Sequence, residues 1–598
     1  MSETHQNTLT WKGTRLPAGE ACNGCRERKR RCVRRKRELP CLSCQAENRP
    51  CDVSRYRRRR RRRRGPNKRN CKSLRVLDGQ SAEPFNMHQQ PDTDSCSEIQ
   101  HGIETDECGS HCRIPSQSPG PNPEPQPAAS TYSLCLPSYV TGVPKHLALV
   151  TLNALREKGA FTLPPAEIQT YLISSYIMHV HPNMPFLDLE RLLEAVILRC
   201  RGRQTSMLLL QAVMFAGSIF LDPVYLHLMG YTSRRAAMRD LFGRAKLLYE
   251  CGFEVQPTYK LQSLLLFTLF HEDDLAGSSF WMGEAWNIAK TIGLQYDLQE
   301  VPVDESSSEL AFRRRLWWCV YTRDRLLALS TRSAMHISDG DYNVPMLALA
   351  DFKSCFGTAE AYRALQLDYD LRTDGTKTAL ALTFIYKIKL SQLIGRVLMS
   401  QYTIASASPT TMLYYPRLTP ISLSDFLGME NDLDVWETSL PSLLEFPLPL
   451  LSPVSQAEKI IYAQRAMLHM IYLTCINALH RPWSSSAQPT SSDPWEGAFR
   501  DLSAWKIEYA SQAILMIATH LHSIGLTNFL ADTAVPSLLS AMITHIVRLN
   551  SDILVAPEAN AVCFVQGWEC LQGLREKYEW ARHAAAFIRF TTRSLRTG

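Results

Sequence analysis

Six cysteines between residues 22 and 51 form the part of this 598-residue chain whose residue types and spacing most clearly predict chemistry. They follow the pattern C-x2-C-x6-C-x8-C-x2-C-x6-C, in which one three-cysteine half occurs twice. The six are Cys22, Cys25, Cys32, Cys41, Cys44 and Cys51. A C-x2-C pair lets two thiolates bind one ion from a single turn, and tetrahedral zinc takes four ligands. Six sulfurs can therefore hold two Zn²⁺ ions if two of the sulfurs bridge both metals.

Two other interpretations of the cysteines are three disulfides and unrelated surface thiols. Disulfides form in oxidising compartments, and the polar stretch from Met1 to Glu20 lacks the apolar core of a secretory signal. Unrelated cysteines would rarely repeat the same spacing. Two Zn²⁺ and six thiolates carry a charge of −2, which neighbouring Arg and Lys side chains would offset. We therefore expect a binuclear zinc site.

A basic stretch between Cys25 and Cys32 is short enough to form one or two helical turns held at both ends by metal ligands. Such a helix can enter the major groove of DNA, where Lys and Arg donors meet the O6 and N7 acceptors of guanine. The alternative is that these side chains contact only phosphates. The candidates for DNA contact are Arg26, Arg28, Lys29, Arg30 and Arg31.

An uninterrupted run of eight arginines follows the cysteines: Arg57, Arg58, Arg59, Arg60, Arg61, Arg62, Arg63 and Arg64. The run predicts phosphate or minor-groove contact beside the specific site, a nuclear import signal, or both. The alternative is a solvated tail, although blocks of like charge are more often interaction tails.

The six-cysteine pattern resembles the DNA-binding domain of fungal zinc binuclear cluster transcription factors. The resemblance implies that Cys22 and Cys41 bridge the two metals and that Pro40 shapes the loop between the halves. It also implies that Lys29, four residues after the second cysteine, reads a CGG-type triplet. Arg28 and Arg31 match basic neighbours in the family pattern, whereas Arg26 and Arg30 are expected to contact the DNA backbone. No sustained heptad repeat follows Arg75, so a coiled coil is not expected there.

The charge distribution separates a basic head from a mildly acidic body. Residues 1–75 contain 25 Lys and Arg against 6 Asp and Glu, a net charge of +19, whereas the whole chain carries only +8. Hydrophobic residues make up 45% of the chain, typical of a protein that is mostly globular. Among the longest apolar stretches, residues 207–221 are too short to span a bilayer, so no membrane partner is expected.

The expected fold is a small zinc binuclear cluster domain, with short helices and loops around two zinc ions, followed by a disordered linker and a large all-α regulatory domain. We expect a disordered linker because the segment is rich in Ser, Pro and Gln and cannot bury enough apolar surface to fold. The boundaries are a disordered N-terminus at 1–21, the cluster domain at 22–52, an arginine-rich extension at 53–75, the linker at 76–145, a fungal-specific helical domain at 146–400 and a C-terminal helical regulatory region at 401–598.

Apolar residues after about His146 recur at helical spacing, which predicts an α-helical body. Ser278 and Ser279 are expected to cap a helix whose buried face ends before Gly293. A second pattern, from Ile514 to Ile524, is expected to end at Gly525 in the same way.

The text from Arg313 to Leu329, followed by Met335 to Leu347, resembles the fungal-specific transcription factor middle domain. Upstream segments at 176–193 and 261–294 fit the same order, so the likeness covers roughly residues 165–350. Within it, Trp317, Trp318 and Tyr321 could form an effector pocket or a regulatory interface. Packing in the core is favoured, with charged neighbours linking helices. Residues 423–437 could form an activation segment, although a surface helix is favoured.

An enzyme is not expected. The chain has no Gly-x-Ser-x-Gly elbow, phosphate loop ending in Gly-Lys, or His-Glu-x-x-His pair. His271 and Glu272 lack a second histidine, and His179 and His181 lie in a predicted helical layer where structural histidines are common. A closed thiolate cluster also leaves zinc no open position for a substrate.

The sequence thus predicts a nuclear, sequence-specific RNA polymerase II transcription factor that binds G-rich, CGG-type sites and regulates a metabolic or biosynthetic pathway. The alternative is an arginine-rich RNA-binding or nuclear assembly protein with a structural zinc cluster. The expected cofactor is Zn²⁺, two ions per chain. The expected partners are double-stranded DNA, the transcription machinery and an import receptor, while a homodimer and a small-molecule effector stay open.

Overall fold

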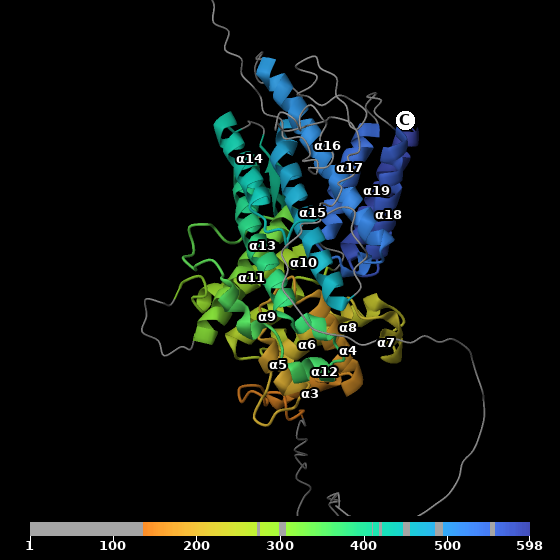
Figure 1. Cartoon of the computed structure of the whole chain (residues 1–598). Coiled ribbons are helices and arrows are strands. Elements are labelled where there is room, and N and C mark those ends of the chain that lie inside the picture. Colours follow the sequence, from red (N-terminus) through yellow and green to blue (C-terminus); the bar gives the residue numbers. More distant parts are fainter. Residues whose placement is uncertain are drawn as a thin grey trace, which may run out of the picture. The chain divides into compact units, whose positions relative to one another are not determined.

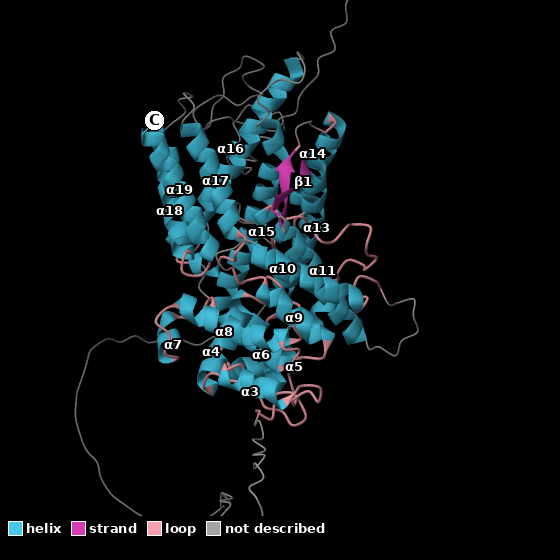
Figure 2. Ribbon diagram, turned by 180° about the vertical axis from the view of Figure 1, so that it is seen from behind, coloured by secondary structure: helices cyan, strands magenta, loops and turns pink. Residues whose placement is uncertain are grey.

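The computed structural model describes residues 136–271, 276–297, 307–408, 411–417, 421–446, 455–484, 494–549 and 557–597. All of them belong to one compact unit, Pro125–Gly598. They are mainly helical, as the sequence predicts (Figure 2). The regions that the sequence separates at residue 400 pack together within this unit, because α13 (Asp374–Gln401) lies against α15 (Gln456–Ser484).

The helices before residue 332 gather in the lower part of Figure 1. They are α3 (Leu149–Glu157), α4 (Ala166–His179), α5 (Leu189–Val196), α6 (Met207–Ser218), α7 (Pro223–Leu228), α8 (Arg234–Glu250), α9 (Pro257–Phe267), α10 (Ala276–Thr291) and α11 (Ser307–Thr331).

The later elements include a group of long helices that pack side by side, in which α16 lies against α15, α17 and α18 (Figure 1). These elements are the 3-10 helix η2 (Leu349–Cys355), α12 (Ala359–Ala364), the 3-10 helix η3 (Tyr369–Arg372), α14 (Leu423–Thr438), α16 (Pro494–Ser523), the 3-10 helix η4 (Thr527–Phe529), α17 (Ala534–Leu549), α18 (Pro557–Leu574) and α19 (Glu579–Thr597).

Helix α6 lies at the centre of the first group, and all of its residues are buried. It packs against α4, α8 and α9, which explains why its sequence is apolar on every side. Ser206 caps it by accepting a hydrogen bond from the Leu209 amide. Gly217 permits a close approach to α4, because a Cβ there would lie 2.1 Å from the Leu172 carbonyl oxygen. Any larger residue would force these two helices apart.

A two-stranded antiparallel hairpin departs from the all-helical expectation. Strands β1 (Tyr402–Ser408) and β2 (Thr411–Pro416) pair with Tyr402 opposite Pro416. The Tyr402 hydroxyl donates to the Ala478 carbonyl at 2.7 Å, which fixes the hairpin to α15. Only Tyr414 of β2 is buried, so the strand shows no regular alternation, and the short run was too weak a signal to identify in advance.

Two predicted helix ends are confirmed and one predicted start is wrong. Gly293 and Gly525 have φ angles of +61° and +72°, the left-handed conformation that ends helices. Helix α10, however, begins at Ala276, so Ser278 lies inside the helix and is buried rather than capping it.

The folded body begins before residue 146, where the sequence places the end of the linker. Tyr139 and Val140 are buried, and the Thr205 amide donates to the Tyr139 carbonyl at 2.9 Å. The Thr141 amide returns a bond of 2.9 Å to the Thr205 carbonyl. The two buried apolar residues and the backbone pairing with Thr205 attach this segment to the body. Such an attachment produces no periodic pattern in the sequence.

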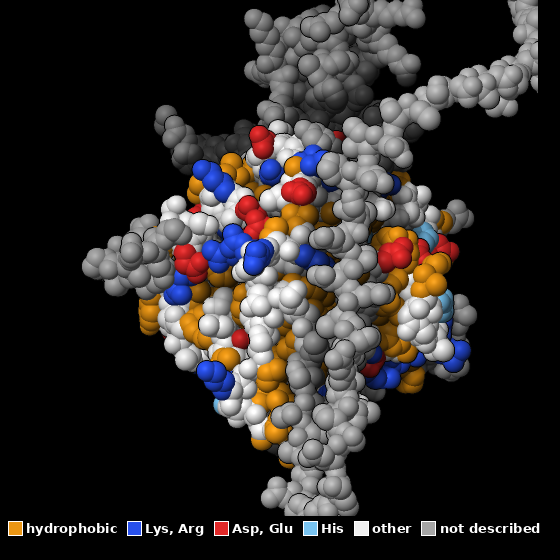
Figure 3. All heavy atoms as spheres, turned by 90° about the horizontal axis from the view of Figure 1, so that it is seen from below, with side chains coloured by type: hydrophobic (Ala, Val, Ile, Leu, Met, Phe, Trp, Pro, Cys, Tyr) orange, Lys and Arg blue, Asp and Glu red, His pale blue; other side chains and the backbone are white. Residues whose placement is uncertain are grey.

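The face of the body in Figure 3 mixes hydrophobic side chains with Lys, Arg, Asp and Glu, as protein surfaces ordinarily do. Within the part of the chain that the structure describes, no helix is both long enough and apolar enough to cross a membrane.

Candidate regulatory site

The middle of α11 is buried from Arg315 to Ala328 although it contains several charges. Trp317, Trp318 and Tyr321 are almost fully enclosed, and the Trp318 indole donates to the Pro345 carbonyl at 2.8 Å. The rings of both tryptophans pack near that of Tyr342. These aromatics are therefore core residues, as the sequence favours, and the charged side chains between them need partners.

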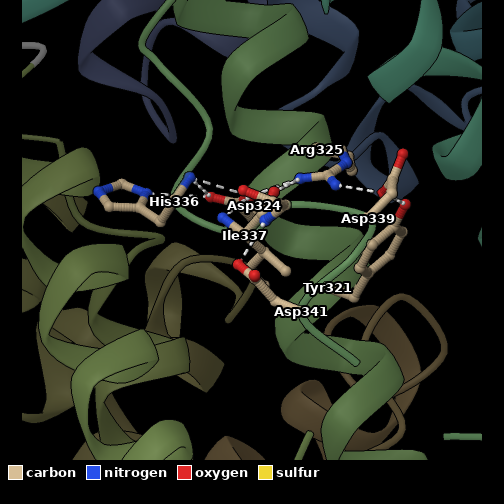
Figure 4. Close-up of polar contacts among 8 residues, drawn as sticks. Tyr321, Asp324, Arg325, His336, Ile337, Asp339 and Asp341 are labelled. Atoms are coloured by element: carbon tan, nitrogen blue, oxygen red, sulfur yellow. Dashed lines mark hydrogen bonds and ion pairs between the residues drawn. The ribbon is translucent and has the colours of Figure 1, made fainter. Parts of the chain in front are cut away.

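Asp324 is the centre of a buried polar network (Figure 4). Its carboxylate accepts hydrogen bonds from the backbone amides of His336 and Ile337 at 3.0 and 3.2 Å. It also lies 3.0 Å from His336 Nδ1 and accepts from the Arg325 guanidinium at 2.8 Å. A carboxylate satisfied in this way fixes the segment after α11 to the helix itself.

Arg325 extends the same network to Asp339 (Figure 4). Its guanidinium donates to Asp339 at 2.7 Å and to the Ile337 carbonyl at 2.8 Å, and it lies 4.4 Å from the centre of the Tyr321 ring. Burial alone would lower the pKa of Arg325, but Tyr321, Asp324 and Asp339 outweigh it and raise the pKa. Gly395 of α13 leaves room for this side chain, because a Cβ there would lie 2.7 Å from Arg325 Nε.

Arg323 connects α11 to a residue far along the chain. It donates to Asp532 at 2.7 Å, and both side chains are only 4% exposed. It also donates to the hydroxyl and carbonyl of Thr268 at 2.8 and 2.9 Å. Burial would raise the pKa of Asp532, but the adjacent guanidinium holds that pKa below its ordinary value. The pair is therefore charged, and it joins three segments of the body.

The three arginines at 313–315 also make ordinary links between elements. Arg313 donates to the Ile292 carbonyl at 3.3 Å, which ties α11 to the end of α10. Arg314 lies 3.3 Å from Asp297. Arg315 is fully buried and donates to the Asp351 carbonyl of η2. The charges of α11 thus hold neighbouring segments in place, which is the interpretation that the sequence favours.

The buried histidines are structural as well. His179 stacks on Phe220 with ring centres 4.7 Å apart, and burial lowers its pKa to about 3. His181 lies 3.0 Å from the Cys355 carbonyl and 3.1 Å from its sulfur. This is not a nucleophile–base pair, because burial lowers the pKa of His181 to about 3 and raises that of Cys355 to about 11.

His271 stacks on Trp580 with ring centres 5.1 Å apart, and burial lowers its pKa to about 4. Glu272 lies outside the described residues. Among the described residues, no group of three or more His, Cys, Asp or Glu side chains is placed to hold a metal ion.

Residues 423–438 form α14, as the sequence favours over an activation segment. Phe426, Met429, Leu433 and Trp436 step by three, four and three residues and are buried. Leu427, by contrast, is 48% exposed.

A cavity of about 560 Å³ lies where α7 and the start of α8 face the junction between α18 and α19. Many of its lining side chains are basic. The adjacent arginines Arg234 and Arg235 are visible in the sequence, but nothing there shows that residues near 575 and 582 lie opposite this pair.

The residues predicted to bind zinc and DNA lie outside the described residues. They are the six cysteines from Cys22 to Cys51, the basic residues from Arg26 to Arg31, and the run from Arg57 to Arg64. Their roles stay predictions from the sequence.

Comparison with known proteins places the chain in a family. The fungal specific transcription factor domain matches residues 173–438, a range that includes α11 and its network. The protein "Transcription factor cpaR" of Aspergillus oryzae is 98% identical over 598 residues, the full length of both chains. This chain belongs to the fungal-specific transcription factors. The family resemblance predicted from the sequence is therefore confirmed for the helical body.

More distant fungal-specific transcription factors match a large part of the chain. Cutinase transcription factor 1 beta of Fusarium vanettenii is 32% identical over 465 residues, which cover 76% of this chain and 52% of that protein. Cutinase transcription factor 1 alpha from the same fungus is 24% identical over 616 residues, covering 94% of this chain and 62% of that protein. These relatives point to the regulation of transcription and not to an enzyme.

Proposed function

We propose that this transcription factor recognises CGG-type DNA through a binuclear zinc cluster at residues 22–52 and regulates genes transcribed by RNA polymerase II in the nucleus. The repeated C-x2-C-x6-C spacing carries the proposal, because six thiolates at this spacing suit two zinc ions with two bridging sulfurs. The family assignment of the body supports it, since a regulator of transcription needs a DNA-binding part.

The basic stretch inside the first half of the cluster would supply the contacts to bases. Lys29 is the proposed reader of guanine, with Arg28 and Arg31 beside it. The eight arginines at 57–64 would add phosphate contacts and the signal for an import receptor. The names of the cutinase factors suggest regulation of a metabolic pathway, which is the proposed output here as well.

Three measurements on the full-length protein test this proposal. Metal analysis should return about two zinc ions per chain. Thorough chelation should abolish specific DNA binding, because zinc binding supplies the free energy that folds a site of this kind. Selection from randomised duplexes should enrich a CGG-type triplet. Fewer than two zinc ions, or a protein that prefers RNA and enriches no duplex motif, would favour the arginine-rich RNA-binding alternative.

A matched pair of lysine variants separates base reading from general charge. Lys29→Ala should lose about 1–3 kcal/mol of specific binding, roughly a 5-fold to 150-fold loss, because one good contact to guanine is removed. Lys12→Ala removes the same charge ten residues before the cluster and should have little effect. Competition assays against a scrambled duplex measure the affinity of each variant for the specific site. If Lys29→Ala and Lys12→Ala lose the same affinity, Lys29 does not read a base.

A further inference from the structure

The cavity beside α8 concentrates positive charge. Six cationic side chains line it against two carboxylates, those of Glu576 and Glu579, which leaves an excess of four basic groups. The six are Arg234, Arg235, Arg239, Arg575, Lys577 and Arg582. Like charges gathered in one concave site repel one another and favour a bound counter-ion.

The start of α8 adds to this field. Arg234 and Arg235 occupy its first turn, which contains no acidic residue. Cations are disfavoured at this end of a helix, because the backbone dipole already places partial positive charge there. Ser233 caps the Ala236 amide, so the helix follows its ordinary start signal in every respect except charge. Such a local conflict is typical of a functional site.

Two basic side chains of the lining form their hydrogen bonds with neutral carbonyl groups. Lys577 is 5% exposed, and its ammonium donates to the neutral Asn528 carbonyl at 2.6 Å. Burial and the nearby Arg234 lower the pKa of Lys577 to about 7, although Glu576 opposes this. Arg234 donates to the carbonyls of Ser218, Ile219 and Leu221, while its buried Nε has no hydrogen-bond partner among the described residues.

The two carboxylates of the lining are outnumbered by its basic side chains. Glu579 is shared between Arg235 at 3.1 Å and Arg582 at 3.6 Å, so one carboxylate serves two guanidinium groups. Glu576 is exposed. The Arg575 guanidinium donates to the neutral amide of Gln572. An anion entering the cavity would therefore meet more basic side chains than carboxylates.

Part of the remaining lining is apolar and gives a ligand a nonpolar surface to contact. Leu226, Met238, Leu269 and Phe270 contribute to the walls. All four side chains are buried. A cavity of about 560 Å³ is within the size range of sites for small organic molecules. A purely inorganic ion would leave these walls without contacts, so the lining suits a molecule with both an apolar body and a charged head.

We propose that this cavity binds an amphipathic organic anion, a carboxylate or phosphate monoester with an apolar body, as a regulatory ligand of the helical domain. The regulatory role rests on the proposed function. The binding itself does not, because it depends only on residues of the helical body.

Isothermal titration calorimetry of the full chain with three naphthalene probes tests the proposal. 2-Naphthylacetate and 2-naphthyl phosphate carry the two kinds of anionic head, and 2-naphthylacetamide is the neutral control. We expect saturable binding of at least one anion at about one site per chain, at least tenfold tighter than the amide and weaker at high salt. The anion that binds more tightly shows whether the cavity prefers a carboxylate or a phosphate head group. Equal binding of the amide, or binding of neither anion, would overturn the proposal.

Charge variants locate the site. Arg239 and Arg582 are exposed at the cavity, so the double variant Arg239→Gln/Arg582→Gln should fold normally and bind the preferred probe about tenfold more weakly. The matched control Arg201→Gln/Arg363→Gln removes two exposed arginines from elsewhere and should bind normally. Unchanged binding by the cavity variant would refute the site.

Hydrogen exchange supplies a readout that needs no variant. The bound probe should slow exchange at 232–239 and 572–582, and protection only elsewhere would refute the site. A CGG duplex titrated into the same preparation separates the two proposals. DNA binding without anion binding refutes only the cavity, whereas anion binding without specific DNA binding refutes only the proposed function.

Discussion

The ion pair between Arg323 and Asp532 should be one of the most costly in the body to break. Asp532→Asn keeps the shape of the side chain but removes its charge, which leaves a guanidinium that is 4% exposed without a counter-charge. Breaking a buried pair from one side costs about 3–5 kcal/mol. A unit of about 470 residues has an unfolding entropy near 1 kcal/mol per kelvin, so the melting temperature should fall by about 3–5 °C.

The matched control is Asp432→Asn, whose partner Arg396 is 50% exposed and which is itself 37% exposed. Water already screens that pair, so the expected cost is about 0–1 kcal/mol, a shift of at most about 1 °C. Differential scanning calorimetry of both variants checks the difference. The double variant Arg323→Met/Asp532→Leu should lose less than the two single variants together. Equal shifts for the two aspartates would refute the conclusion that burial makes the α11 pair critical.

Three further predictions follow from particular residues. Gly217→Ala should lower the free energy of unfolding by about 3 kcal/mol or more, because its Cβ would lie 2.1 Å from a backbone oxygen. Gly243→Ala, in open space on α8, should raise the free energy of unfolding by about 0.5–1 kcal/mol. Urea titrations of the two variants compare these changes. His179 has a folded pKa of about 3, below its unfolded value of about 6.5, so its stabilising effect is complete above pH 6.5 and is lost progressively as the pH falls, by about 2 kcal/mol at pH 5. The melting temperature should therefore fall less between pH 7 and pH 5 in His179→Phe than in the original protein. An equal fall in both proteins would contradict the low folded pKa of His179. Replacing residues 57–64 with Gly and Ser should weaken binding to all duplexes and reduce the salt slope by about 0.9 for each lost phosphate contact; a titration with the original slope would exclude phosphate contact.

The helical body could be predicted because its signals are local. The glycine stops at 293 and 525 depend only on residues within one helical turn, and the structure confirms both. The core position of Trp317 and Trp318 follows from their size and spacing. The hairpin at 402–416 was missed because two short strands give little periodic signal and are fixed by contacts with distant helices.

The partners of the buried charges could not be predicted, since each lies far away in the sequence. Nothing near Arg323 indicates that Asp532 will neutralise it, more than two hundred residues later. The cationic cavity has the same origin, because Arg235 and Arg582 meet only after the whole chain between them has folded. Spacing motifs reveal sites built from one segment, such as the six cysteines, whereas sites built from several segments require the fold.

The link from α11 to Asp532 also affects how shortened versions of this protein should be understood. Residue 532 lies well beyond the stretch that defines the family, which ends at 438. A stop codon between residues 438 and 532 would leave the buried Arg323 without its counter-charge and would expose the apolar sides of the remaining helices. The failure of such an allele in a genetic screen would report collapse of the whole body, not the loss of an activity carried by the missing piece.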